Sequence, residues 1–280
     1  MLIRCWGARG SIPVSGKEYL KYGGDTTCIE IRTEEDEIII IDAGTGIRRL
    51  GNQLLQENRR NYSMIFTHAH WDHLLGFPFF KPIYVDGTAI EMFGCPFAQE
   101  SVKKMISTIM SPPNFPVDFR DIKAELTYHQ DACEHPFSIK SLEVIPILLN
   151  HPNQGIGYKF VEKGKTFVFL TDNELTFEHP GGLGFSDYRA FCSGADLLIH
   201  DAEYREEEYK LTAGWGHSAY KDALRLAIDS NVRRFGLFHH NQDRTDQGVD
   251  EMVRDCRRLT QGKDASPECF AVCQGMEITV

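Results

Sequence analysis

The stretch Thr67-His68-Ala69-His70-Trp71-Asp72-His73 decides how the rest of this sequence is interpreted. It follows a short apolar run that predicts a buried strand. Side chains two residues apart on an extended segment point the same way, so His68 and His70 can bind one metal ion together. Asp72 and His73 come where the chain is expected to turn into a helix, and they would face a second ion. Such a group of ligand-type residues is costly to bury without a metal ion or a salt partner.

The residue types also indicate which cofactor to expect. Imidazole and carboxylate ligands suit zinc, with manganese or iron as alternatives. A lone histidine is usually a satisfied core or surface residue, but that explanation does not suit so dense a run. We therefore expect two divalent metal ions, with Zn²⁺ as the first choice.

Six short apolar runs each lead into a residue that can bind metal. Most are rich in β-branched or aromatic residues, which predicts strands buried on both faces. Ligands gather where strands end in layered α/β folds, so these residues predict one site at one edge of the sheets. The runs and the residues that follow them are 38–41 with Asp42, 64–66 with His68, 144–149 with His151, 167–170 with Asp172, 197–199 with His200 and Asp201, and 235–238 with His239 and His240.

Amphipathic helices are expected between these strands, over residues 45–57, 97–110, 218–230 and 249–259. Asn58 is a plausible stop for the first of them, and Ser218 is a plausible N-cap for the third. No internal repeat or linker interrupts the chain, so residues 1–280 are expected to form a single domain.

Composition limits the partners and the compartment. The formal net charge is −10 and the basic clusters are short, so we expect long nucleic acids to be disfavoured as partners. Eight scattered cysteines, none in a CxxC pair, are typical of a reduced intracellular protein. The N-terminus does not resemble a signal peptide, and no stretch reaches the length of a membrane span. These features predict a cytoplasmic protein with no membrane contact.

The HxHxDH run from His68 to His73 resembles the signature of the metallo-β-lactamase superfamily, and the resemblance covers nearly the whole chain. It implies an α/β fold, a four-layer αββα sandwich, with Asp42 as the structural aspartate that precedes the signature. It also implies a ligand set for two ions. The first would be held by His68, His70 and His151, the second by Asp72, His73 and His239, with Asp172 bridging both.

His239 and His240 are alternatives for the last ligand, because neighbouring residues on a strand point opposite ways. His239 is preferred, since its spacing from the apolar run resembles the family pattern. His240 would then support the site or face the substrate. His200 also ends a strand and is expected to have a supporting or structural role.

Two further features resemble the ribonuclease Z-like phosphodiesterase branch. The segment Leu198-Ile199-His200-Asp201-Ala202, followed by Gly216-His217-Ser218, is similar to a pattern in which an acidic residue orients a histidine just before a helix. Ribonuclease Z itself normally has Glu where this chain has Asp201. The other feature is the pair of N-terminal segments at 7–11 and 23–28, which looks like the opening of this branch.

This resemblance implies a dinuclear hydrolase, most simply a phosphodiesterase that attacks through a metal-bridging hydroxide. The catalytic residues would be Asp72, which is also a metal ligand, and His217 held by Asp201. His217 would stabilise the transition state or protonate the leaving oxygen. Between His151 and Asp172, where tRNA-processing members carry a long arm, this chain has room for one hairpin. Together with the acidic net charge, this short stretch favours a small phosphodiester such as a cyclic nucleotide as the substrate.

Other functions remain open at this point. Hydrolysis of a carboxylic ester, thioester or lactone on the same metals is the alternative, and it would not need His217 or Asp201. A redox or non-catalytic metal protein is a third possibility, although diiron redox members generally have Glu where this chain has His70. A homodimer is compatible with the resemblance, since members of this branch often dimerise.

The segment at 110–117 carries three prolines, which make it stiff and non-helical. It is either a packed surface loop or an apolar lid in which Phe115 stacks on a base or ring of the substrate. Trp215, just before Gly216, is a further candidate for the pocket lining.

The lid hypothesis predicts that Phe115→Ala raises KM for a substrate with an aromatic group, because a stacking contact is lost. Steady-state kinetics on a nucleotide substrate provide the measurement. An unchanged KM would favour the packed surface loop.

Overall fold

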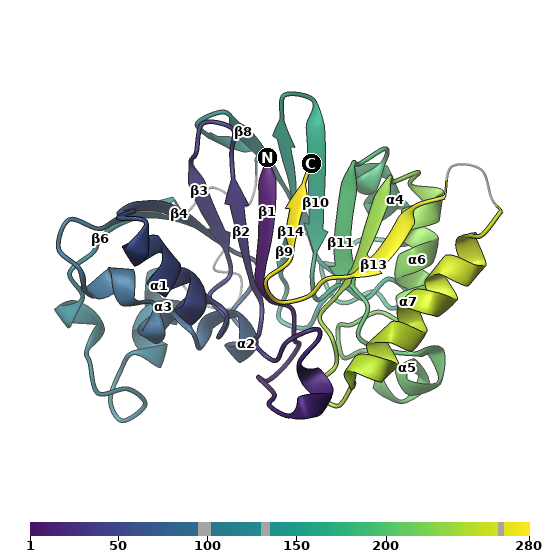
Figure 1. The fold of residues 1–280 in the computed structure, drawn as a ribbon, viewed down its shortest axis with the longest axis horizontal. Helices are drawn as coiled ribbons and strands as arrows, with labels where there is room; N and C mark the ends of the chain where they lie inside the picture. Colours follow the sequence, from purple (N-terminus) through teal and green to yellow (C-terminus); the bar gives the residue numbers. More distant parts are fainter. Residues whose placement is uncertain (95–101, 130–134, 263–265) are drawn as a thin grey trace.

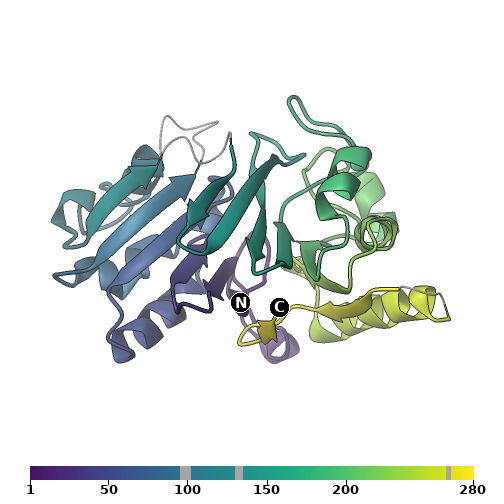
Figure 2. The same cartoon turned by 90° about the horizontal axis from the view of Figure 1, so that it is seen from above.

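The structure is a computed structural model that describes residues 1–94, 102–129, 135–262 and 266–280. Two seven-stranded sheets lie face to face in the middle of the molecule, and helices cover the outer face of each sheet (Figure 1). The view from above in Figure 2 shows the same succession of helices, sheet, sheet and helices. The prediction of an α/β, four-layer αββα sandwich is therefore confirmed.

The first sheet changes from antiparallel to parallel pairing at its centre. Strands β14 to β3 pair antiparallel, and strands β3 to β6 pair parallel. The strand order is β14 (Glu277–Thr279), β1 (Leu2–Gly7), β2 (Cys28–Arg32), β3 (Ile38–Ile41), β4 (Asn61–Phe66), β5 (Ala89–Gly94) and β6 (Glu125–His129).

The second sheet repeats this arrangement. Strands β7 to β10 pair antiparallel, and strands β10 to β13 pair parallel. The strand order is β13 (Glu268–Ala271), β12 (Arg234–Phe238), β11 (Leu197–Asp201), β10 (Lys165–Leu170), β9 (Ile156–Glu162), β8 (Leu142–Leu148) and β7 (Phe137–Ile139). The β9–β10 pair is the hairpin predicted between His151 and Asp172.

Helices α1 (Ile47–Gln56) and α3 (Val102–Ile109) cover the first sheet, on the left of Figure 1. Helices α4 (Phe185–Cys192), α6 (Tyr220–Asp229) and α7 (Asp246–Thr260) cover the second sheet, on the right. Two shorter helices, α2 (Trp71–Leu74) and α5 (Glu206–Thr212), lie near the lower edge of the sheets in Figure 1. Short 3-10 helices occur at Lys17–Tyr19, Phe77–Phe79, Lys81–Tyr84 and Phe119–Asp121.

Three apolar layers separate the four layers of secondary structure. The middle layer joins the two sheets through side chains such as Ile31 from β2, Phe160 from β9 and Phe169 from β10. The outer two layers lie between each sheet and its helices. This explains why the strands read as continuous apolar runs, since most central strands are covered on both faces.

The strands that lead into the predicted ligands end at the same edge. In the second sheet, β8, β10, β11 and β12 all run in one direction, as the alternation of their pairings requires. In the first sheet, β3 and β4 are parallel, and α2 follows β4 at the lower edge in Figure 1. The chain termini lie together at the opposite edge (Figure 1), where the Val280 amide donates to the Met1 carbonyl at 3.0 Å.

Helix boundaries agree with the sequence in part. Helix α1 ends before Asn58, whose φ of 56° breaks the helix as predicted. Of the helix predicted over 97–110, residues 102–109 form α3, while 95–101 lie outside the described residues. Helix α7 begins at Asp246, three residues earlier than predicted, because the Thr245 hydroxyl accepts from the Gly248 amide at 3.3 Å and caps it.

The prediction that Ser218 caps α6 is wrong. The helix begins at Tyr220, and the Ser218 hydroxyl instead donates to the Asn173 carbonyl at 2.6 Å and accepts from the Leu175 amide at 3.0 Å. This contact between distant segments takes the side chain away from the helix start.

The described residues also bear on membrane spans and on the cysteines. Within the described residues, no helix combines the length and the apolar character needed to cross a membrane. Six cysteines in the described part are free thiols, and Cys95 and Cys133 lie outside it.

The middle apolar layer predicts a stability difference between two Leu→Ala variants. Leu197→Ala removes a fully buried side chain from this layer and should lower the free energy of unfolding by about 2–5 kcal/mol. Leu211→Ala, at a residue that is 84% exposed, should change it by less than about 0.5 kcal/mol. Urea unfolding measures both, and equal effects would contradict the assigned layer.

Candidate metal centre

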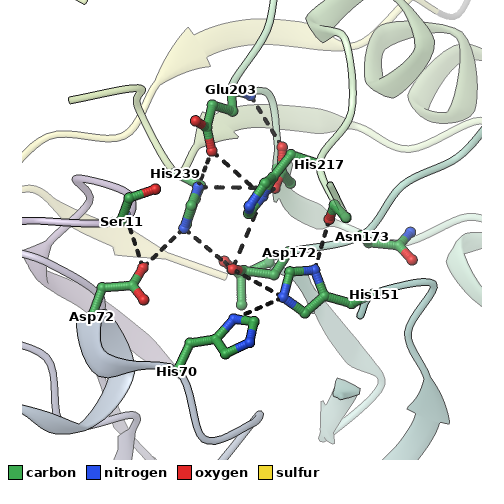
Figure 3. Close-up of polar contacts among 12 residues, drawn as sticks. Ser11, His70, Asp72, His151, Asp172, Asn173, Glu203, His217 and His239 are labelled. Carbon is green, nitrogen blue, oxygen red and sulfur yellow. Dashed lines mark hydrogen bonds and ion pairs between the residues drawn. The ribbon is translucent and has the colours of Figure 1, made fainter. Parts of the chain in front are cut away.

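The predicted metal ligands gather into two clusters where the strands of both sheets end. Figure 3 shows five of them, His70, Asp72, His151, Asp172 and His239. Within each cluster the potential ligand atoms all lie within 4.8 Å of one another. Asp172 belongs to both clusters. The first comprises His68, His70, His151 and Asp172, and the second comprises Asp72, His73, Asp172 and His239.

In the first cluster the ring nitrogens converge on a common point. His70 Nδ1 lies 3.0 Å from His151 Nε2, and the Asp172 Oδ2 atom lies 3.5 Å from His68 Nε2 and 3.9 Å from His151 Nε2. Three imidazoles from two sheets therefore face one carboxylate oxygen, which is an arrangement suited to a zinc ion.

The second cluster is built around two carboxylates. His239 Nε2 lies 3.1 Å from Asp72 Oδ2 and 3.3 Å from Asp172 Oδ2. His73 Nε2 lies 3.3 Å from Asp72 Oδ2 and 3.3 Å from Asp172 Oδ1. Asp172 thus presents one oxygen to each histidine of this cluster.

Two buried ring nitrogens test whether metal ions fit these clusters. His68 Nε2 and His73 Nε2 are buried and have no hydrogen-bond partner in the described structure. Leaving a buried polar atom unsatisfied costs about 1–3 kcal/mol. Divalent cations at the two clusters would satisfy both atoms, so the residues present fit such ions.

The opposite ring nitrogen of three histidines is held in place by a second residue. His73 Nδ1 donates to Asp42 Oδ2 at 2.7 Å, and His239 Nδ1 donates to Glu203 Oε2 at 2.9 Å. His151 Nδ1 donates to the Gly216 carbonyl at 2.9 Å. Each contact fixes the tautomer and directs Nε2 toward Asp172, as the outer hydrogen-bond partners of metal-binding histidines commonly do.

Unusual backbone conformations place three of these side chains. Asp42, Asp172 and His239 have φ values of 61°, 50° and 55°, in the left-handed region that non-glycine residues seldom adopt. Each lies at the end of an apolar strand. The left-handed conformation breaks the alternation of side-chain directions along the strand and turns the side chain into the site. Strained backbone conformations of this kind are concentrated at functional sites.

This turn explains the positions of His239 and His240. His239 enters the second cluster, whereas His240 Nε2 donates to the Val272 carbonyl at 2.8 Å and its ring packs edge-on to Tyr22. His200 also points away from both clusters. Its Nδ1 donates to the Asp201 carbonyl at 2.6 Å, and its Nε2 accepts from the Asn173 amide group at 3.2 Å.

Burial and charge act differently on the two clusters. Burial lowers the pKa of His151 to about 3 and that of His68 well below its usual value, so both are neutral imidazoles able to bind metal. Burial acts in the same direction on His73 and His239, but nearby carboxylates including Asp172 outweigh it and raise the pKa of both histidines. Cation binding at the second cluster would therefore displace protons.

Asp201 and His217 form the predicted pair beside the clusters. Asp201 Oδ2 accepts from His217 Nδ1 at 2.6 Å, so the Asp side chain is long enough for a direct contact. Burial alone would lower the pKa of His217, but the carboxylates of Glu203 and Asp201 raise it to about 9. The His217 ring stacks on His239 with ring centroids 4.6 Å apart (Figure 3).

Sequence reasoning missed Glu203, which is buried between two histidines. Its Oε2 atom accepts from His239 and lies 3.5 Å from His217 Nδ1, while its Oε1 accepts from Asn241 at 2.8 Å. The signal that could have found it is its spacing of two from Asp201, which puts both carboxylates on one face of an extended segment.

The N-terminal segment at 7–11 also reaches the site. The fully buried Arg9 donates to the carbonyls of Gly23, Asn241 and Arg244, and so fixes the segment in place. The Ser11 amide donates to Asp72 Oδ2 at 2.9 Å (Figure 3). A Cβ atom on Gly10 would lie 2.3 Å from the His239 ring, so this position has room only for glycine.

The aromatic residues proposed for the pocket lie in different environments. Phe115 is partly buried and packs edge-on against Phe79 with centroids 5.5 Å apart. Trp215 is 63% exposed and directly precedes Gly216. The lid and lining roles stay predictions.

The fold and the paired clusters define a hydrolase of the metallo-β-lactamase type. The model of the beta-lactamase superfamily domain matches residues 37–240, and the chain belongs to this superfamily. Its metal-dependent hydrolase character, with divalent ions as cofactors, is thereby confirmed.

Similar proteins agree with the ribonuclease Z-like branch. Ribonuclease Z of Lactococcus lactis subsp. lactis is 24% identical over 276 residues, covering 82% of this chain and 87% of the relative. The human tRNase Z short form has a TM-score of 0.67 at 20% identity and covers 100% of this chain and 99% of its own. The metallo-beta-lactamase fold protein YhfI of Bacillus subtilis has a TM-score of 0.72 at 13% identity, with coverages of 99% and 98%.

The prediction that long nucleic acids are disfavoured as partners is wrong. Curated relatives are named ribonuclease Z, and a similar structure is a tRNase Z, so a chain of this type is compatible with a long RNA substrate. The net charge is a sum over the whole molecule, whereas a nucleic acid contacts only one face of it. The short β9–β10 hairpin is weaker evidence about the substrate than the similarity to these relatives.

Paired His→Gln variants test the left-handed turn at His239. His239→Gln should lower the zinc content by about one ion per chain, because a predicted ligand of the second cluster is lost. His240→Gln should keep the wild-type content, since glutamine can still donate to the Val272 carbonyl. Elemental analysis after dialysis measures both, and the reverse result would transfer the ligand role to His240.

Proposed function

We propose that this chain is a phosphodiesterase that works with two divalent ions, zinc in the first instance. His68, His70 and His151 would hold one ion, and Asp72, His73 and His239 the other. Asp172 would bridge them, in keeping with its place in both clusters. The cleaved bond would be a phosphodiester, either in RNA or in a smaller molecule.

The ions would supply an activated water and neutralise charge on the phosphoryl oxygens when bound. The chain's own residues provide the rest. Asp42, Glu203 and the Gly216 carbonyl hold the imidazoles in the required orientation. Burial of the surrounding carboxylates and rings excludes bulk water and strengthens these interactions.

His217 would protonate the leaving oxygen. Its Nδ1 is committed to Asp201, so the proton available to a substrate is the one on Nε2. The raised pKa of about 9 keeps this imidazole charged at neutral pH, which also favours an anionic phosphate over a neutral ester.

The Asp201–His217 contact at 2.6 Å, directly beside both clusters, is the observation that carries the proposal. Expulsion of an alkoxide from a phosphodiester benefits from a general acid. Hydrolysis of a carboxylic ester, thioester or lactone would not need this pair. The relatives named ribonuclease Z add support, because that name denotes cleavage of phosphodiester bonds in RNA.

A substrate panel tests the proposed bond. Purified protein should hydrolyse at least one of an RNA with a 3′ extension, a dinucleotide, a cyclic nucleotide and a chromogenic diester. Chelation should abolish turnover, and zinc or manganese should restore it. Turnover of thioesters or lactones, with every diester left intact, would reject the proposal.

His217→Ala tests the acid role. Turnover of a dinucleotide should fall by about 100- to 10,000-fold, because a general acid contributes a factor of this size. His129→Ala, at an exposed histidine on β6, should retain wild-type turnover. Unchanged dinucleotide turnover in the His217 variant, measured by product chromatography, would assign the chemistry to the metals alone.

A further inference from the structure

Glu174 is a fully buried carboxylate two residues after Asp172 that belongs to neither cluster. Its Oε1 atom accepts from the Tyr209 hydroxyl at 2.6 Å and the Gly214 amide at 2.7 Å. Its Oε2 atom accepts from His179 Nε2 at 2.8 Å and the Gly216 amide at 2.8 Å. A carboxylate offers about four acceptor positions, so these bonds saturate it and offset its burial.

The two backbone amides show what this carboxylate holds. Gly214 and Gly216 have φ values of +86° and +94°, which favour glycine and bend the chain so that both amides face Glu174. The exposed Trp215 lies between them. The path of the chain into His217 is therefore fixed from one side by Glu174.

The other side of His217 is held by the same segment of chain. The Ser218 hydroxyl donates to the Asn173 carbonyl at 2.6 Å and accepts from the Leu175 amide at 3.0 Å. Residues 173–175 thus bind the chain immediately before and immediately after His217. Since this segment directly follows Asp172, its hydrogen bonds fix the position of His217 relative to Asp172.

The first cluster depends on the same anchor. The Gly216 carbonyl accepts from His151 Nδ1 at 2.9 Å, and a Cβ atom on Gly216 would lie only 2.0 Å from that nitrogen. The His151 and His217 rings lie edge to face with centroids 5.2 Å apart (Figure 3). A shift of the Gly216 backbone would therefore move both rings.

We propose that Glu174 is a positioning residue that, through the Gly214 and Gly216 amides, sets His217 against the leaving oxygen and His151 against the first metal ion. This inference rests on the proposed phosphodiesterase function. Glu174 touches neither cluster, so its effect must pass through the backbone. Its partners are the Gly214 and Gly216 amides, Tyr209 on α5 and His179, which distinguishes it from a carboxylate that only joins core elements.

Glu174→Gln is the decisive variant, because it keeps the side chain's size while turning one acceptor oxygen into a donor that faces other donors. With zinc saturating, kcat for a dinucleotide should fall by about 10- to 100-fold, with little change in KM. For a diester with a p-nitrophenol leaving group the loss should be less than about threefold, because that oxygen leaves without a proton. Glu178→Gln, at an exposed carboxylate in the same segment between β10 and α4 as Glu174, is the matched control and should behave as wild type.

The double variant Glu174→Gln/His217→Ala identifies the route of the effect. If Glu174 acts through His217, the double variant should be no slower on the dinucleotide than His217→Ala alone. Multiplied losses, together with equal losses on both substrates, would show that Glu174 only supports the fold. Wild-type kinetics in Glu174→Gln would also overturn the inference.

A metal-binding measurement gives a readout that does not depend on turnover. Competition with a chromogenic chelator should show zinc binding weakened by about 10-fold in Glu174→Gln, because His151 loses its fixed orientation. Unchanged affinity would remove the His151 half of the inference. If this variant does not fold, Tyr209→Phe removes a single donor and should produce smaller shifts in the same directions.

Failure of the proposed function and failure of the role of Glu174 give different experimental results. A wild-type protein that cleaves no diester rejects the proposed function. A wild-type protein that does so, with a Glu174→Gln variant indistinguishable from it in kinetics and zinc affinity, rejects only the role of Glu174.

Discussion

The site depends on one buried carboxylate that faces four imidazoles. Asp172 lies 3.3–3.9 Å from the Nε2 atoms of His68, His73, His151 and His239. The first two histidines come from the chain after β4 and the other two from the second sheet, so this carboxylate lies where the sheets meet. Buried carboxylates and imidazoles packed this closely are stable only when bound cations or protons neutralise the negative charge of the carboxylates. The αββα architecture serves to bring these strand ends to one point.

Around this centre the same type of hydrogen bond recurs at three histidines. A histidine directs Nε2 inward because its Nδ1 is bound from behind, by Asp42, by Glu203 or by the Gly216 carbonyl. The outer partners are themselves held, as Asp42 is by the Thr67 amide at 2.8 Å. Preorganised ligands lose little freedom when a cation or substrate binds, which favours both affinity and rate.

The sequence predicted the features that are local and missed those that depend on distant contacts. An apolar run and the ligand that follows it are adjacent in the chain, so Asp42, His68 and Asp172 could be found together. Strand alternation alone leaves His239 and His240 as alternatives, and His239 is preferred only from the resemblance, because the left-handed turn that places it is not evident in the sequence. Ser218 was misassigned because its hydroxyl is bound by residues more than 40 positions away.

The same limit explains why the net charge of the sequence wrongly disfavoured long nucleic acids as partners. Nine carboxylates are buried among the described residues, where Arg9 is the only buried Lys or Arg. These nine buried negative charges nearly account for the formal net charge of −10, and they are shielded from solvent. Several surround the metal clusters, where two divalent cations would neutralise them. The exterior is thus far closer to balance than the composition suggests, and an acidic sequence of this kind is compatible with an RNA substrate.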